Sequence, residues 1–168
     1  GLAEFLDNEL SSVINKDSKR PNKPKDIVLY GFGRIGRLVT RMMIQNTGPG
    51  NYYRLRAVVI RKASEDDIYK RASLLSRDSV HGPFDGTVRV DEKQSSLVIN
   101  GNSVKIIYAQ NPKDVNYHDY DIKDPIVIDN TGVWRDFNGL SQHIYSNAAK
   151  VILTAPGKGD IKNIVYGV

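Results

Sequence analysis

Three glycines with the spacing G-x-G-x-x-G are the residues of this chain best suited to hold a phosphorylated ligand. They are Gly31, Gly33 and Gly36, and they follow an apolar run, IVLY, at residues 27–30. Glycine at the first position permits a tight turn, at the second it lets the backbone approach a pyrophosphate, and at the third it lets a helix pack closely on a strand. A helix that begins here adds free N–H groups and a partial positive charge. The spacing alone is a weak signal, so its meaning depends on the elements around it.

The surrounding residues alternate between short apolar runs and amphipathic segments. Strands are predicted at 27–30, 54–60, 125–130, 150–156 and 163–168, helices at 34–46, 64–77 and 135–149, and three short strands within 86–109. In the last segment Asn100-Gly101 is a typical hairpin turn, and Ser64 is the expected N-cap of the second helix. Strands that are apolar on both faces and alternate with helices favour a parallel sheet covered on both sides. The sequence therefore predicts a doubly wound α/β domain of the Rossmann type with a small hairpin insertion.

Ligands of such sheets bind beyond the carboxyl ends of the strands. Four predicted loops leave strands at this edge, at 31–36, 61–62, 130–134 and 154–157, so we expect one crevice where they meet. A dinucleotide suits this arrangement, and a plain strand-to-helix turn without a ligand is the alternative. Trp134, in the third loop, is equally suited to flank a flat ring or to anchor the core.

The composition excludes several kinds of site. The 168 residues include no cysteine, which removes disulfides, thiolate metal ligands and a cysteine nucleophile. The three histidines, His81, His118 and His143, lack metal-ligand spacing, so neither a metal site nor a catalytic residue is predicted. The net charge of +5 is spread along the chain, and the basic stretch at 18–25 is interpreted as a linker, so nucleic-acid binding is the weaker hypothesis. No apolar run approaches the roughly 20 residues of a membrane-spanning helix.

The first 25 residues differ from the rest. The apolar residues at 2, 5, 6, 10, 13 and 14 form one helical face, and the proline-containing stretch that follows cannot continue the helix. We expect an N-terminal extension at 1–25, a helix plus a linker, and a dinucleotide-binding domain at 26–168. Because the chain starts without methionine and ends directly after an apolar run, we also expect both ends to be cut from a longer protein.

Five segments together resemble the NAD-binding domain of glyceraldehyde-3-phosphate dehydrogenases. They are YGFGRIGRLV at 30–39, RDSVHGPFDGTV at 77–88, NTGVW at 130–134, ILTAPGKGD at 152–160 and VYGV at 165–168, in the family's order and spacing across 26–168. The resemblance implies a cytoplasmic, glycolytic enzyme, a homotetramer when complete, that oxidises a phosphorylated aldehyde. In this family a cysteine thiolate attacks the aldehyde and a histidine is the base. Both belong to family segments that follow the part represented here.

The resemblance also implies that this chain alone is inactive and is a monomer or a weak dimer. The covalent chemistry and much of the subunit contact belong to the family's other domain. A relative that uses erythrose 4-phosphate and a non-catalytic dinucleotide-binding module remain alternatives, and no membrane partner is expected.

The family's cofactor contacts carry over to a set of positions spread over the four loops. These positions are Gly31, Phe32, Gly33, Arg34, Ile35, Gly36, Arg61, Lys62, Gln110, Thr131, Gly132, Trp134, Thr154 and Ala155. The resemblance implies that the glycine turn, with Arg34 and Ile35, contacts the pyrophosphate. It implies that residues 131–134 line the path of the adenosine and the linking phosphates, and that Thr154 and Ala155 lie near the nicotinamide ribose.

Three positions depart from the family's pattern. Tyr30 replaces asparagine before the first glycine, Gln110 replaces a basic residue near the adenine, and Lys62, after Arg61, replaces the acid at the end of the second strand. An acid there binds the ribose 2′-hydroxyl, whereas a cation favours a 2′-phosphate. The acids at 65–66 lie within one turn and could still reach the ribose. The expected cofactor is therefore NAD, with NADP as an open alternative.

Overall fold

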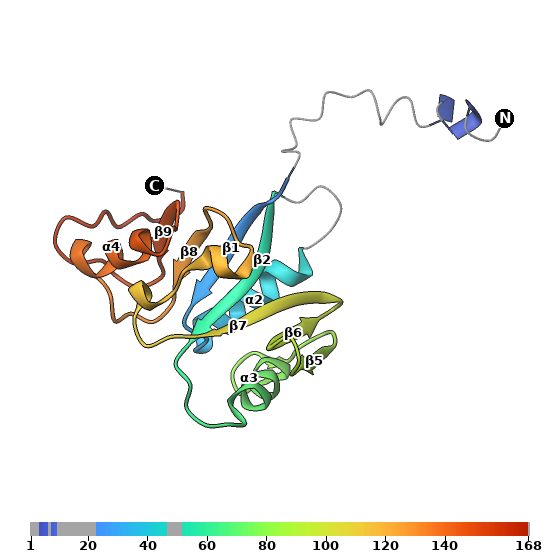
Figure 1. Cartoon of the computed structure of the whole chain (residues 1–168), viewed down its shortest axis with the longest axis horizontal. Coiled ribbons are helices and arrows are strands. Elements are labelled where there is room, and N and C mark those ends of the chain that lie inside the picture. The colour runs from blue at the N-terminus through green and yellow to red at the C-terminus, as the bar shows by residue number, and fades with distance from the viewer. Residues whose placement is uncertain (1–3, 7, 10–22, 47–51, 168) are drawn as a thin grey trace.

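A seven-stranded sheet forms the centre of the computed structural model, which describes residues 4–6, 8–9, 23–46 and 52–167 (Figure 1). Its strands are β1 (Lys25–Tyr30), β2 (Tyr53–Ile60), β5 (Val88–Asp91), β6 (Ser96–Ile99), β7 (Asn102–Tyr108), β8 (Ile126–Asp129) and β9 (Lys150–Leu153). They lie in the order β5-β6-β7-β2-β1-β8-β9. The five strands from β7 to β9 in that order are parallel, whereas β5 and β6 pair in the antiparallel sense. The predicted parallel sheet is confirmed, and it carries an antiparallel edge.

Strand β1 marks the point where the direction of strand addition reverses. The chain places β2 and then β7 on one side of β1, and later places β8 and β9 on the other. The loops after β1 and β8 therefore leave the sheet side by side. In open α/β sheets this switch point, beyond the carboxyl ends of the strands, is where ligands bind.

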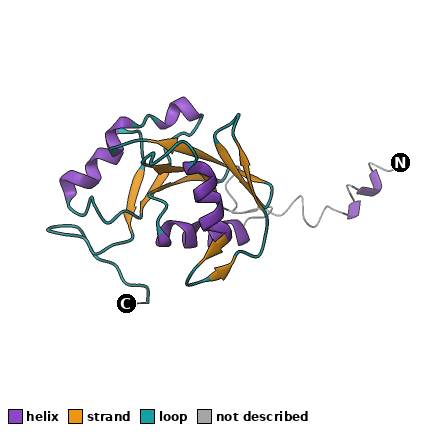
Figure 2. Cartoon of the chain, turned by 90° about the horizontal axis from the view of Figure 1, so that it is seen from below, coloured by secondary structure: helices purple, strands orange, loops and turns teal. Residues whose placement is uncertain are grey.

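Helical segments cover both faces of the sheet (Figure 2). Alternate residues of β1 point to opposite faces, so that Ile27 and Leu29 join one core cluster while Val28 and Tyr30 join the other. The first face is covered by α2 (Arg34–Gln45) and α3 (Asp67–Ser76), and the second by α4 (Phe137–Tyr145) with two 3₁₀ turns, η1 (Pro112–Asp114) and η2 (Tyr117–Tyr120). The doubly wound arrangement is thus confirmed, although short 3₁₀ turns replace a full helix between β7 and β8.

The hairpin predicted at Asn100-Gly101 joins β6 to β7. Asn100 and Gly101 both have positive φ, 47° and 80°, as the two central residues of a type I′ turn require. Since β7 also pairs with β2, this hairpin extends the main sheet. A second, two-stranded sheet is formed by β3 (Arg77–Asp78) and β4 (Gly82–Pro83).

The strand predicted at 163–168 is wrong for the residues that are described. Residues 162–167 form no strand, and Ile164 and Val165 are 88% and 67% exposed. An apolar run becomes a strand only where a neighbour offers backbone hydrogen bonds. Here the chain leaves the sheet after β9, so residues 163–167 have no strand beside them.

The predicted start of the second helix is also wrong. Ser64 is not the N-cap, because residues 64–66 form a bend and a turn, and α3 begins at Asp67 with Asp66 as its N-cap. The acid in the first turn, which suits the positive end of the helix dipole, is Asp67.

Most of the helix predicted at 2–15 lies outside the described residues. Residues 4–6 and 8–9 are helical, and the side chains of Phe5 and Leu6 are exposed. Among the described residues, no helix combines the length and the apolar character that crossing a bilayer requires.

Candidate functional site

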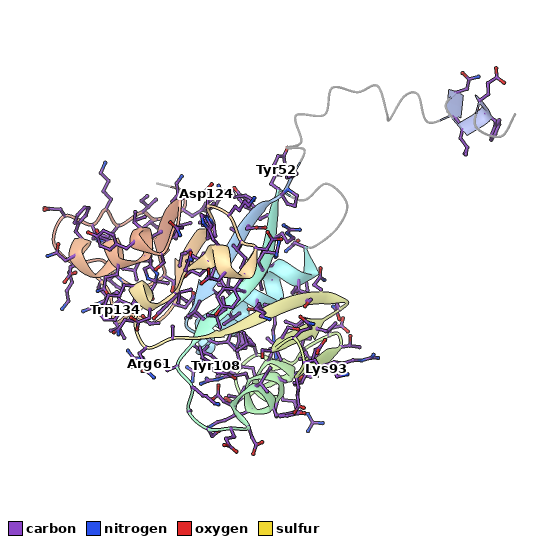
Figure 3. The ribbon with its side chains drawn as sticks, viewed as in Figure 1. Tyr52, Arg61, Lys93, Tyr108, Asp124 and Trp134 are labelled. Carbon is purple, nitrogen blue, oxygen red and sulfur yellow. The ribbon has the colours of Figure 1, made fainter. Side chains whose placement is uncertain are left out.

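The carboxyl ends of the parallel strands surround a cleft of about 230 Å³. Figure 3 shows Arg61, Tyr108 and Trp134 at this end of the sheet, with Tyr52 and Asp124 at the opposite end. The cleft is lined by Tyr30, Gly31, Phe32, Val59, Ile60, Arg61, Arg71, Ala109, Thr131 and Val133. Three of the four predicted loops, those after β1, β2 and β8, contribute to this lining, and the end of β7 adds Ala109. No residue of the fourth predicted loop, 154–157, lines the cleft.

The three glycines of the turn after β1 have different surroundings. Gly31 has a φ of 93°, and a Cβ atom on it would lie 2.8 Å from Cγ2 of Thr131. A Cβ atom on Gly36 would lie within 3.0 Å of the carbonyl oxygen of Gly31, so a side chain there would push α2 away from β1. Around Gly33, by contrast, a Cβ atom would meet nothing within 4 Å. The fold itself requires the first and third glycines, while the second leaves open space.

This open space lies at the N-terminus of α2. Gly33 is the N-cap of α2, no side chain caps the helix, and its first turn contains no acid. The first N–H groups of a helix have no partner within the helix, and they carry a partial positive charge. The residues present therefore fit the pyrophosphate of a dinucleotide. Arg34 and Ile35, in the first turn, have exposed side chains beside this position.

A buried Asp–His pair orders the turn after β8. The carboxylate of Asp129 accepts hydrogen bonds from the backbone N–H and the hydroxyl of Thr131, both at 2.7 Å. Its other oxygen accepts a bond from Nε2 of His143 in α4 at 3.0 Å, and both side chains are fully buried. The hydroxyl of Thr131 then accepts the N–H of Val133. The shape of the predicted loop at 130–134 thus depends on two residues that sequence reasoning did not assign to the site.

The loop after β9 lies beside this turn. The backbone N–H of Thr154 donates to the carbonyl oxygen of Asp129 at 3.0 Å, and its hydroxyl lies 3.3 Å from Oδ1 of Asn130. A Cβ atom on Gly132 would lie 3.7 Å from that of Ala155. The structure therefore places Thr154 and Ala155, predicted to lie near the nicotinamide ribose, beside Thr131 and Gly132, predicted to lie along the adenosine and the linking phosphates.

Two aromatic residues of the predicted set pack into the core. Phe32 is buried in the first core cluster, so its side chain is mostly used for packing. Trp134 packs against the second core cluster and does not line the cleft. Gln110 is exposed and follows Ala109, which does line it.

The cations at the end of β2 lie in different places. Arg61 lines the cleft, together with Arg71 of α3. Lys62 does not; its Nζ lies 5.9 Å from the centroid of the Tyr108 ring, over its face, in a cation–π contact. Arg71 carried no signal in the sequence, because it lies in the middle of a helix and reaches the cleft only through the fold.

Burial controls the ionisation of the tyrosines near the cleft. Burial, together with the charge of Asp129, raises the pKa of Tyr30 to about 12. Burial also raises the pKa of Tyr108, and the charge of Asp67 adds to this effect. Both phenols are therefore neutral at neutral pH, and the arginines supply the charge of the cleft.

An ion pair connects helix α2 to β3, the short strand that follows α3. Arg37 of α2 donates to Asp78 at 2.8 Å and approaches the carbonyl oxygen of Phe32 at 3.5 Å. Asp78 also accepts bonds from the backbone N–H groups of Val80 and His81. These bonds stabilise the ionised carboxylate and hold the pKa of Asp78 well below its usual range. The bond from Arg37 has the largest effect. His81 thus has a structural partner. The described residues contain no cluster of side chains suited to a metal ion.

Comparisons with known proteins show which family this chain resembles. The family model described as "Glyceraldehyde 3-phosphate dehydrogenase, NAD binding domain" matches residues 25–137. A "glyceraldehyde-3-phosphate dehydrogenase-like protein" of Pseudomonas aeruginosa is 51% identical over 168 residues, which is 99% of this chain and 36% of the relative. Glyceraldehyde-3-phosphate dehydrogenases of Thermotoga maritima and Bacillus subtilis are each 34% identical, over 84% of this chain and 39% and 38% of the relatives. The chain thus spans less than two-fifths of the length of these proteins.

Proposed function

Since the chain belongs to the glyceraldehyde-3-phosphate dehydrogenase family, we propose that it is the part of a phosphorylating aldehyde dehydrogenase that binds the nicotinamide dinucleotide. The open space at Gly33 is the observation that carries this proposal. A turn that served only to connect β1 to α2 would need Gly31 and Gly36, but it would not need a third glycine with nothing within 4 Å of its Cβ position.

Different parts of the site hold different parts of the ligand. The turn at 31–36 and the N-terminus of α2 bind the pyrophosphate through backbone N–H groups. The cleft beside Arg61 takes the adenosine end, Thr131 and Gly132 lie along the linking phosphates, and Thr154 and Ala155 orient the nicotinamide end. The Asp129–His143 pair acts indirectly, because it fixes the conformation of Thr131. When bound, the dinucleotide supplies a hydride acceptor.

The covalent step is proposed to lie outside this chain. The sequence contains no cysteine, so it offers no thiolate to attack an aldehyde. The chain spans 36–39% of the relatives compared with it, and we propose that the nucleophile and the base belong to the rest of the protein. A phosphorylated aldehyde as substrate, a homotetrameric assembly and a cytoplasmic location are proposals that rest on the family alone.

A second candidate is a dinucleotide-binding protein of this family without dehydrogenase activity. It is favoured by one observation: the relative that is 51% identical has "dehydrogenase-like" in its name. The complete protein separates the two candidates. Binding of the dinucleotide without oxidation of glyceraldehyde 3-phosphate would favour the second.

Calorimetric titration of the chain with NAD tests the proposed function. We expect saturable binding of one dinucleotide, and no NADH when phosphate and glyceraldehyde 3-phosphate are added. Absence of binding to any nicotinamide dinucleotide would refute the proposed function. Formation of NADH above the buffer blank would refute the proposal that the covalent chemistry lies elsewhere.

A further inference from the structure

Two arginines and no acid line the adenosine side of the cleft. Arg61 follows β2, Arg71 comes from α3, and both line the cleft with Gly31 and Thr131. None of the described residues that line it is acidic. The site therefore offers two guanidinium groups to a ligand where a site for an uncharged ribose would offer a carboxylate.

The guanidinium of Arg71 is held in place by the carboxylate of Asp67. Its Nε donates to Oδ2 of Asp67 at 3.2 Å, and its Nη2 lies 3.2 Å from Oδ1 of the same carboxylate. The side chain of Asp67 is fully buried, and that of Arg71 is 21% exposed. A guanidinium has five N–H groups, so this two-point contact leaves several of them for a ligand. The buried carboxylate fixes the direction of the fork, which lowers the entropy lost when an anion binds.

The carboxylates that follow Lys62 in the sequence do not replace the acid that the family has at the end of the second strand. Glu65 and Asp66 are exposed and lie outside the lining of the cleft. Asp67 is buried and pairs with Arg71. Lys62 occupies the family's acid position, but its ammonium group lies over Tyr108. In dinucleotide-binding folds an acid here accepts a hydrogen bond from the ribose 2′-hydroxyl, and an arginine accommodates a 2′-phosphate.

We propose that Arg61 and Arg71 form a subsite for a phosphate on the 2′ position of the adenine ribose, so that this chain binds NADP in preference to NAD. The inference rests on the proposed function, because it concerns the adenosine end of the same site. It departs from the expectation of NAD, and it assigns the selectivity to Arg61 and Arg71 and not to Lys62. Arginine suits this role because its planar fork meets two phosphate oxygens at once.

Calorimetry with NAD and NADP, on the wild-type chain and on three variants, tests the subsite. Wild type should bind NADP about tenfold more tightly than NAD, as charge-assisted hydrogen bonds of ordinary strength give. Arg61→Gln should remove most of this preference, because it should weaken the binding of NADP much more than the binding of NAD. For Arg71 the variant is the double change Asp67→Asn with Arg71→Gln, because Arg71→Gln alone would leave a buried carboxylate unpaired. The double variant should also reduce the preference for NADP over NAD.

Lys62→Gln is the matched control, since it removes a neighbouring cation that does not line the cleft. Its ratio of the two dissociation constants should stay at the wild-type value. Equal or tighter binding of NAD by wild type would overturn the inference while leaving the proposed function intact. The inference would also be overturned if the preference for NADP fell in Lys62→Gln and not in the arginine variants. Failure of wild type to bind either dinucleotide would refute the proposed function as well.

Discussion

Asp78 is the residue that connects helix α2 to β3, the short strand that follows α3. Its carboxylate accepts bonds from Arg37 and from the backbone N–H groups of Val80 and His81, and these bonds lower its pKa. The lowered pKa in the folded state means that ionised Asp78 stabilises the fold. The stabilisation is fully present above the unfolded-state pKa, about 4, and it is lost as the pH falls from there through the lower folded-state value.

We predict that Asp78→Asn lowers the thermal midpoint at pH 7 and weakens the decline of stability in acid. The amide can still accept the backbone N–H bonds, but it loses the ion pair with Arg37. Thermal unfolding between pH 7 and pH 3, followed by circular dichroism, measures this. Asp85→Asn, on an exposed loop, is the control and should follow the wild-type pH dependence. If Asp78→Asn did the same, the ion pair would contribute nothing to stability.

At the same scale, Arg61, Lys62 and Arg71 show how far a sequence predicts a site. The end of β2 is fixed by its apolar run, so the approximate position of Arg61 and Lys62 could be predicted. Which of them faces the cleft could not, because the backbone bends once it leaves the sheet, and Lys62 turns to the ring of Tyr108. Arg71 could not be found at all, since its place in the cleft depends on how α3 packs against the sheet.

At the scale of elements, the packing of α2 on β1 depends on Gly36. A Cβ atom there would meet the carbonyl oxygen of Gly31, a backbone atom that cannot turn aside. Gly33, three residues earlier, has open space around it and an extended backbone with a φ of −74° and a ψ of −160°. The two glycines of one turn therefore provide a matched pair, in which one is required by packing and the other is not.

We predict that Gly36→Ala destabilises the chain by about 1–3 kcal/mol, the usual cost of overpacking. Gly33→Ala should cost less, no more than about 1 kcal/mol, because alanine is a poorer N-cap than glycine but meets no other atom there. Urea denaturation of both variants and wild type measures the difference. Equal stability of the two variants would show that α2 does not pack on β1 as described.

Some strands and helices could be predicted from the local pattern of apolar residues, and others could not. Strands β1 and β2 were predictable because the runs at 27–30 and 57–60 are apolar on both faces and end at clear breaks. The run at 163–168 is as apolar, but a strand needs a partner, and none of the described strands lies beside it. Residues 112–120 carry no helical periodicity, so the 3₁₀ turns that cover the second face were not predicted.

At the scale of the whole molecule, apolar side chains gather around α4, β9 and the segment that follows. Phe137 and Ile144 of α4 are 69% and 49% exposed, and Ile164 and Val165 lie along the same hollow. Exposed apolar surface of this kind promotes association. We propose that much of the subunit contact of the complete protein lies outside this chain.

We predict that the chain is a monomer or a weak dimer at micromolar concentration. Replacing Phe137 and Ile144 together by serine should weaken any association and leave the thermal midpoint nearly unchanged, because both side chains are already exposed. Sedimentation velocity over a range of concentrations measures this. A tight tetramer of the wild-type chain would contradict the prediction.

The affinity of Gly33→Val for a nicotinamide dinucleotide is the measurement that tests the central claim most directly. Valine fits the extended backbone at this position and meets no protein atom within 4 Å of its Cβ, so the variant should fold, with a thermal midpoint lowered only by the poorer N-cap. Its side chain would occupy the space proposed for the pyrophosphate, and binding should weaken at least about tenfold, or about 1.4 kcal/mol. Ser103→Val, at the opposite end of the sheet, is the control and should bind as wild type does. A folded Gly33→Val chain with unchanged affinity would show that the dinucleotide does not lie on this turn.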